Sequence, residues 1–262
     1  MSYDLMVFEK GNAPANHSDF LSWYEQKMEE GNEQDISCMS EKMQNFFHSL
    51  RQIFPPMNGT FAPDDKELSE NPAMEKRLCD YSIVEDMIYL SFSYSVSEFA
   101  YNVVKRAAYF AGVGFFNPSD DNSMPILFDS RCPMLLEGQW FRPVKIDDFD
   151  SIREKLSSMT VKNRSYLYVT DQVGNYMQIG GYGDSFTVEK RTYTGPTAYI
   201  HAKAGYADTD DSGNVGEVII AGNSVKVGHN QILSMATAQQ LFQDFFQGIE
   251  TADSIKWVEM DM

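Results

Sequence analysis

The sequence predicts a two-domain α+β protein, and three observations support this fold class. Apolar residues alternate with period two in some segments and follow the spacing of an amphipathic helix in others, which is typical of strands mixed with helices. The length of 262 residues exceeds what one hydrophobic core usually organises. A stretch rich in Pro, Asp, Asn and Ser at residues 118–125 separates two groups of elements. We therefore expect one domain over residues 1–118, a linker over 119–136 and a second domain over 137–262.

The first domain is predicted to follow the ferredoxin-like βαββαβ plan, in which helices cover one face of a four-stranded antiparallel sheet. Pro55 and Pro56 end the second helix, and the polar stretch at 57–76 is expected to be a long surface loop. The expected elements are a strand at 3–8, helices at 18–30 and 40–54, a hairpin at 79–94, a helix at 97–110 and a strand at 113–116.

The second domain is predicted to be an antiparallel sheet covered by helices. A helix at 147–159 comes first, and alternating segments separated by turns rich in Gly, Asn and Asp follow it. Such a meander packs one face against helices and leaves the other face toward solvent. The expected strands lie at 165–170, 176–180, 185–192, 197–204, 216–221 and 224–227.

The C-terminal segment predicts a helix and a short strand. Thr237 and Gln240 have the spacing of a capping box, and Gly248 is placed as a C-cap glycine. Polar residues such as Asp244 are expected to face away from the core, and residues 255–259 to pair with a sheet formed earlier. The apolar stripe that should face the sheet consists of Ala238, Leu241, Phe242, Phe245, Phe246 and Ile249.

The same segment carries a resemblance to a known family. The helix has the form L-F-x-x-F-F at residues 241–246, and W-x-E-M follows at residues 257–260. This pattern resembles the end of immunity protein family one of the bacterial polymorphic toxin systems, and the likeness extends more loosely over residues 137–262. The resemblance implies a small cytoplasmic α+β inhibitor whose partner is a toxin, in several cases one that attacks nucleic acid.

The N-terminal domain has its own resemblance, to a bacterial family known only as uncharacterised. It is carried by M-S-Y-D-L-M-V-F at 1–8, F-P-P-M-N-G at 54–59, D-Y-S-I at 80–83 and G-V-G-F-F at 112–116. This resemblance supports the domain boundary and implies no function.

The charge of the chain limits its partners. The net charge is −17 at pH 7; residues 1–130 hold 21 acidic and 9 basic side chains, and residues 131–262 hold 17 and 12. Nucleic acid and anionic lipid are bound through Lys and Arg, so this balance argues against both as direct partners. Solvated acidic faces are one explanation of the excess, and attraction of a basic protein partner is the other.

The expected location is the cytoplasm. The opening MSYDLMVFEK lacks the basic flank and apolar core of a signal peptide, and no apolar run is long enough to span a bilayer. Three cysteines at wide spacing, Cys38, Cys79 and Cys132, predict neither a disulfide framework nor a zinc site. We expect no metal and no cofactor.

One turn partly imitates a calcium-binding loop. Asp208, Asp210, Ser212 and Gly213 follow the first half of the pattern, but the twelfth position, which requires Glu, is Ile219. A polar turn is therefore the favoured interpretation, and an acidic contact loop for a partner and a weak calcium site are the alternatives. The residues that we expect to bind a partner are Asp208, Asp210, Asp211, Tyr182, Asp184 and Tyr206.

The function expected from these observations is that of an immunity protein, which binds and neutralises a cognate basic toxin domain without catalysis. No G-x-S-x-G elbow or metal-ligand spacing points to an enzyme, and we assign no catalytic residue. The alternative is a small-molecule-binding or regulatory protein with its site between the domains, and a hydrolase or transferase whose site the sequence does not reveal is the third. The sequence leaves open the toxin, the domain that binds it and the oligomeric state.

Overall fold

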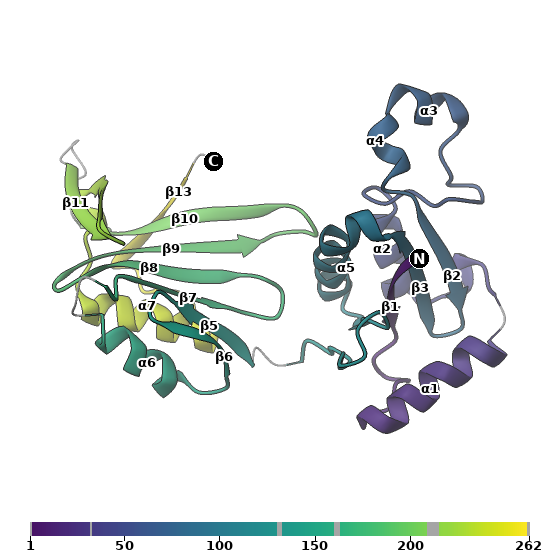
Figure 1. Ribbon diagram of the computed structural model, residues 1–262, viewed down its shortest axis with the longest axis horizontal. Coiled ribbons are helices and arrows are strands. Elements are labelled where there is room, and N and C mark those ends of the chain that lie inside the picture. Colours follow the sequence, from purple (N-terminus) through teal and green to yellow (C-terminus); the bar gives the residue numbers. More distant parts are fainter. Residues whose placement is uncertain (1, 32, 130–132, 160–162, 209–214, 261–262) are drawn as a thin grey trace. The chain divides into compact units, whose positions relative to one another are not determined.

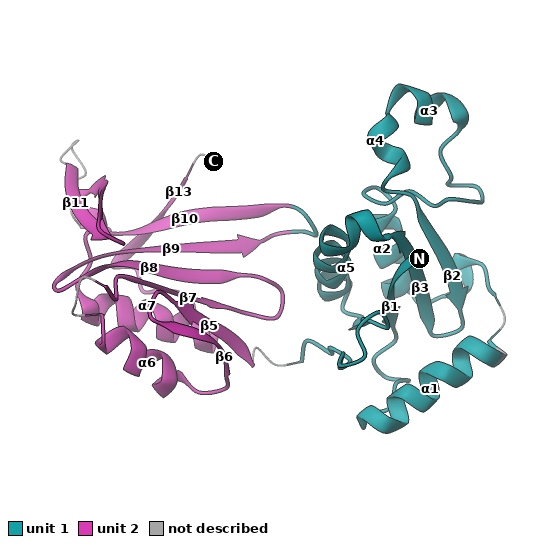
Figure 2. Ribbon diagram, in the orientation of Figure 1, with its two compact units in different colours: residues 1–129, 195–197 teal, residues 130–194, 198–262 magenta. Residues whose placement is uncertain are grey.

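The chain folds into two compact units. The computed structural model describes all residues except 1, 32, 130–132, 160–162, 209–214 and 261–262. One unit consists of residues 1–129 with 195–197, and the other of residues 130–194 and 198–262; Figure 2 shows them in different colours. The fold is therefore mixed α+β with antiparallel sheets, as predicted.

The N-terminal unit contains a four-stranded antiparallel sheet of order β2-β3-β1-β4. The strand β1 lies inside the sheet, because it pairs with β3 on one side and with β4 on the other. The elements are β1 (Ser2–Phe8), α1 (His17–Glu30), a 3-10 turn (Ile36–Cys38), α2 (Glu41–Leu50), α3 (Asp65–Glu70), α4 (Pro72–Glu75), β2 (Cys79–Val84), β3 (Met87–Ser93), a 3-10 turn (Tyr94–Val96), α5 (Ser97–Ala111) and β4 (Gly114–Phe116).

Helices lie on both faces of this sheet, not on one. Successive side chains of a strand point to opposite faces, and in β1 both sets are buried. Leu5 and Val7 share a core with α2 and α5. Met6 and Phe8 pack instead with Phe20 of α1. The expectation of helices on a single face is wrong because α1 brings its own aromatic cluster to the second face.

Two further expectations for this unit are corrected. The stretch 57–76 is not a structureless loop, since it contains α3 and α4, and Asp64 with Glu67 forms a capping box that starts α3. The predicted linker at 119–136 is also too wide. Ile126 exchanges backbone hydrogen bonds with Phe115 next to β1, and Met134 already belongs to a strand of the second unit.

The C-terminal unit contains a seven-stranded antiparallel sheet of order β13-β10-β9-β8-β7-β5-β6 and a separate hairpin of β11 with β12 (Figure 1). The expected strands between residues 165 and 227 are all present. The elements are β5 (Met134–Gly138), β6 (Phe141–Ile146), α6 (Phe149–Ser157), β7 (Tyr166–Thr170), β8 (Tyr176–Tyr182), β9 (Ser185–Tyr193), β10 (Tyr199–Tyr206), β11 (Val215–Ile220), β12 (Asn223–Gly228), a 3-10 turn (His229–Gln231), α7 (Met235–Gln247) and β13 (Ile255–Glu259).

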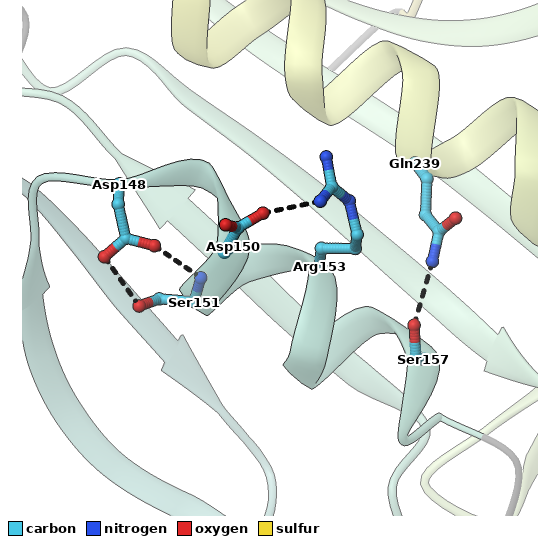
Figure 3. A network of polar contacts seen from close by, with 6 residues as sticks. All are labelled: Asp148, Asp150, Ser151, Arg153, Ser157 and Gln239. Carbon is cyan, nitrogen blue, oxygen red and sulfur yellow. Dashed lines mark hydrogen bonds and ion pairs between the residues drawn. The ribbon is translucent and has the colours of Figure 1, made fainter.

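The helices α6 and α7 cover one face of the large sheet. Ile152 and Leu156 of α6 and Leu241 and Phe242 of α7 share a core with Phe186 of β9. A polar edge accompanies this packing: Gln239 of α7 donates to Ser157 of α6 at 3.0 Å, and Asp148 caps α6 by accepting from the backbone N–H of Ser151 (Figure 3). The two helices do not cover the opposite face of the sheet.

The terminal helix differs in detail from its predicted form. Its N-cap is Ser234, which accepts from the backbone N–H of Thr237, so the helix begins one turn earlier than the expected capping box. The stripe is buried at Ala238, Leu241 and Phe242, but Ile249 is 58% exposed, and Asp244 is buried and accepts from Gln240 at 2.8 Å. Gly248 ends the helix in the left-handed conformation, as predicted.

Among the described helices none is both long and apolar enough to cross a membrane.

Candidate partner-binding site on the C-terminal sheet

The face of the large sheet that α6 and α7 do not cover carries polar and aromatic side chains. In β9, Phe186 and Val188 point into the core beneath the helices, so Thr187 and Glu189 point to the other face. The strand register places Gln178 of β8 and Lys203 of β10 on either side of Glu189. Cross-strand neighbours of this kind contact one another directly.

Glu189 is the centre of a compact charge network. Its Oε1 lies 3.1 Å from Nζ of Lys203, and its Oε2 lies 3.4 Å from Nε2 of His201 and accepts from Nε2 of Gln178 at 2.5 Å. The side chain of Glu189 is only 15% exposed and that of Lys203 only 13%. A charge with so little exposure is tolerated when it is paired and hydrogen-bonded. The network therefore holds the Glu189 carboxylate in a defined position.

The next row of the same face is an aromatic and cationic stack. Register places Tyr176 and His201 on either side of Arg191. The Arg191 guanidinium lies 5.0 Å from the ring centroid of Tyr176 and 4.4 Å from that of Tyr199, which is the geometry of cation–π attraction. Burial raises the pKa of Tyr176, an effect that Arg191 opposes and Glu189 reinforces. Tyr176 therefore keeps its hydroxyl proton.

A cavity of about 190 Å³ opens beside the Glu189 network, above β7, β8 and β9. Ile220 at the end of β11 forms one wall, and it approaches so closely because Gly180 has no side chain: a Cβ there would lie 2.3 Å from Cδ1 of Ile220. Burial and the neighbouring Glu137 carboxylate raise the pKa of Tyr168, so this wall residue is neutral. The side chains that line the cavity include Tyr166, Tyr168, Gln178, Thr187, Glu189 and Ile220.

The structure brings together some of the residues that the sequence singled out for partner binding. Asp184 is exposed in the turn between β8 and β9, and Tyr182 beside it is half-buried. Because β10 runs antiparallel to β9, exposed Asp208 after β10 lies at the same end of the sheet. Asp210 and Asp211 lie outside the described residues.

Tyr206 is a correction to this predicted set. Its hydroxyl lies 3.0 Å from Oγ1 of Thr237 and accepts from the backbone N–H of Ser234 at 3.3 Å. The ring packs against the core of the C-terminal unit. Tyr206 therefore holds the start of α7 on the helix-covered face, and it is not an exposed contact residue of the turn.

The local sequence does not predict the Glu189 network, because it shows which residues of one strand share a face but not which residues of other strands lie beside them. Alternation along T-V-E-K-R at 187–191 shows that Thr187, Glu189 and Arg191 share a face. The partners Gln178 and Lys203 belong to other strands, and only the register brings them to Glu189. Within the described part of the chain, no group of three or more His, Cys, Asp or Glu residues is arranged to hold a metal ion.

Residues of the L-F-x-x-F-F and W-x-E-M patterns build the core of the unit. Leu241 and Phe242 are buried, and Trp257 of β13 packs against the same core with Nζ of Lys190 4.1 Å from its ring centroid. Comparison of the chain with protein families, with curated proteins and with solved structures found no match.

Proposed function

We propose that the chain is an immunity protein that acts in the cytoplasm by binding and neutralising a cognate bacterial toxin, one that acts on nucleic acid. Inhibition is stoichiometric, and no catalytic residue is assigned. The resemblance at residues 241–246 and 257–260 supports this proposal. The partner surface is the end of the C-terminal sheet that carries Asp184 and Asp208.

The observation that carries the proposal is the charge at this end of the sheet. Asp184 and Asp208 are exposed there, and half-buried Tyr182 lies next to them. A toxin that binds nucleic acid needs Lys and Arg on its own binding face. Acidic side chains beside an aromatic residue complement such a face, because the charges steer association and the ring supplies contact area.

For the N-terminal unit we propose the ferredoxin-like fold. Its strand order, β2-β3-β1-β4 with three antiparallel pairings, supports this assignment. The helices α2 and α5 occupy the places of the two helices of that plan, and α1 is an addition on the second face. This part of the proposal carries no function.

The test uses the product of the adjacent gene as the candidate toxin. Co-expression of the chain should restore growth of cells that make the toxin, and the two proteins should co-purify at equal stoichiometry. The double variant Asp184→Lys, Asp208→Lys should slow association at least about tenfold, as charge reversal at a steering surface does. Its stability should change by less than about 0.5 kcal/mol, because both positions are exposed.

Glu29→Lys with Glu33→Lys is the matched control, since both residues are exposed in the N-terminal unit and the net charge changes equally. This control should associate within about twofold of the unchanged protein. Loss of association only in the control would move the binding surface to the N-terminal unit. If the chain neither restores growth nor co-purifies with the toxin, the immunity proposal is wrong, and a small-molecule-binding or regulatory role is favoured.

A further inference from the structure

We infer that the cavity beside the Glu189 network is a binding site for a guanidinium group. The inference extends the proposed function, because an arginine of a basic partner is one source of that group. A free small guanidinium compound is the other.

The size of the cavity limits what it can hold. Sites for drug-sized ligands enclose about 300–1,000 Å³, whereas this cavity encloses about 190 Å³. That space suits one large side chain or a compact small molecule. Pockets that accept a single side chain of the partner are where interface energy concentrates, and arginine is enriched at such positions.

The polar wall offers acceptors to a donor-rich ligand. Thr187 is 5% exposed, and its Oγ1 has no hydrogen-bond partner among the described residues. A buried hydroxyl without a partner is unfavourable, and a ligand that donates to it removes this penalty. Glu189 accepts a hydrogen bond from Gln178 and forms an ion pair with Lys203, and a carboxylate has about four acceptor positions. The Glu189 carboxylate therefore keeps acceptor capacity for a ligand.

The charge around the cavity selects a cation. Among the described residues that line the cavity, Glu189 is the one with a formal charge. Its partners Lys203 and His201 do not line the cavity. Glu137 adds a second carboxylate near Tyr168, and Asp184 is exposed at the nearby end of the sheet. Lys203 offsets part of the Glu189 charge, but it does not line the cavity, so an anion would meet carboxylates in and near the wall and no cation in the wall, which disfavours anionic ligands.

The remaining walls favour guanidinium over ammonium. Tyr166 and Tyr168 supply aromatic rings, and Ile220 supplies an apolar wall for an aliphatic stem. Guanidinium is planar, stacks on aromatic rings and is more weakly hydrated than ammonium. It also presents five donors, and Gln178, Thr187 and Glu189 of the wall carry acceptor oxygens.

The experiment titrates the full chain with N-acetyl-L-arginine amide and follows binding by NMR. N-acetyl-L-citrulline amide, which has the same shape without the charge, should bind at least about tenfold more weakly. Thr187→Val keeps the size of the side chain but removes the hydroxyl, and it should weaken arginine-amide binding about fivefold. Thr192→Val, an exposed position of the same strand, should leave binding unchanged.

A second variant keeps the test informative whatever Thr187→Val does to folding. Tyr168→Leu removes a wall ring from a half-buried position and should weaken the arginine probe about threefold to fivefold. Unchanged melting midpoints show that the variants are folded. Equal binding of the citrulline probe, no binding of either probe at millimolar concentration, or binding that neither variant weakens overturns the inference.

Two further arms identify the source of the guanidinium group. Displacement of the arginine probe by the toxin domain assigns the site to an arginine of the partner. A toxin that binds without displacing the probe assigns it to a small guanidinium compound. Failure of the toxin to bind at all refutes the proposed function, whereas the probe titration alone decides the guanidinium site.

Discussion

Tyr81 shows how one buried hydroxyl links stability to pH. Its hydroxyl donates to the backbone carbonyl of Phe54 at 2.7 Å, and burial raises its pKa well above the ordinary value for tyrosine. The folded protein therefore keeps this proton at a pH where the unfolded chain, with a pKa of about 10, has lost it. Above pH 10 the folded state keeps the Tyr81 proton and the unfolded chain does not. The free energy of unfolding therefore falls as pH rises above about 10.

Tyr81→Phe should make this alkaline loss of stability shallower. Below pH 9 the variant should lose about 1 kcal/mol, because the hydrogen bond to Phe54 is gone. Above pH 10 the difference between the two proteins should shrink. Urea unfolding from pH 8 to pH 11 measures both effects. Burial also raises the pKa values of Tyr24, Tyr89 and Tyr101, so the variant should still lose some stability as pH rises. If the free energies of unfolding of the two proteins differ by the same amount at every pH, Tyr81 is not a source of the pH dependence.

The position of the N-cap of α7 depends on contacts with a residue that is distant in sequence. Ser234 and Thr237 are both residues that favour an N-cap position, and local sequence does not choose between them. The choice depends on Tyr206 of β10, whose hydroxyl accepts from the N–H of Ser234 and lies 3.0 Å from Oγ1 of Thr237. These contacts fix Thr237 inside the first turn and leave Ser234 as the cap.

Ser234→Ala should therefore destabilise the C-terminal unit by about 1 kcal/mol, the usual effect of losing an N-cap. Gln240→Ala tests the alternative, in which Gln240 would complete a capping box with Thr237. Gln240 instead donates to Asp244 within the helix, so this variant should change stability by less than about 0.5 kcal/mol. Thermal unfolding of the two variants compares them directly, and a larger loss in Gln240→Ala would restore the cap at Thr237.

The strand β6 marks the limit of prediction from local pattern. Buried strands such as β8 and β9 alternate apolar and polar residues, so the sequence predicts them well. In β6 four consecutive residues, 142–145, are exposed and Pro143 lies among them. The strand is at the edge of the sheet, where proline is tolerated and neither face need be apolar. The segment therefore shows no alternation of period two, and its sequence does not predict a strand.

The candidate site was predictable only in part for a related reason. Exposed turn residues such as Asp184 follow from composition, because Gly and Asp between alternating segments predict a turn. The Glu189 network needs side chains from β8, β9 and β10 in one register. Register is decided by the buried face, which pairs Val188 with Ile179 and thereby brings Gln178 to Glu189. That pairing is a property of the folded sheet.

At the scale of the whole molecule, the charge is uneven between two units with separate hydrophobic cores. The N-terminal half holds most of the acidic excess, while the proposed partner surface is in the C-terminal unit. Long-range attraction acts over about 8–10 Å at physiological salt. The local carboxylates at the end of the C-terminal sheet should therefore control association more than the total charge does.

This view predicts the salt dependence of toxin association. The rate constant, measured by stopped-flow fluorescence, should fall at least about tenfold between 20 mM and 500 mM NaCl, because salt screens steering of a basic partner by Asp184 and Asp208. The dissociation rate should change far less, since contacts already formed are screened weakly. In the variant Asp184→Lys, Asp208→Lys the salt dependence should flatten or reverse, whereas Glu29→Lys with Glu33→Lys should keep the original slope. Equal slopes in both variants would mean that the net charge of −17, and not the acidic end of the sheet, governs the encounter.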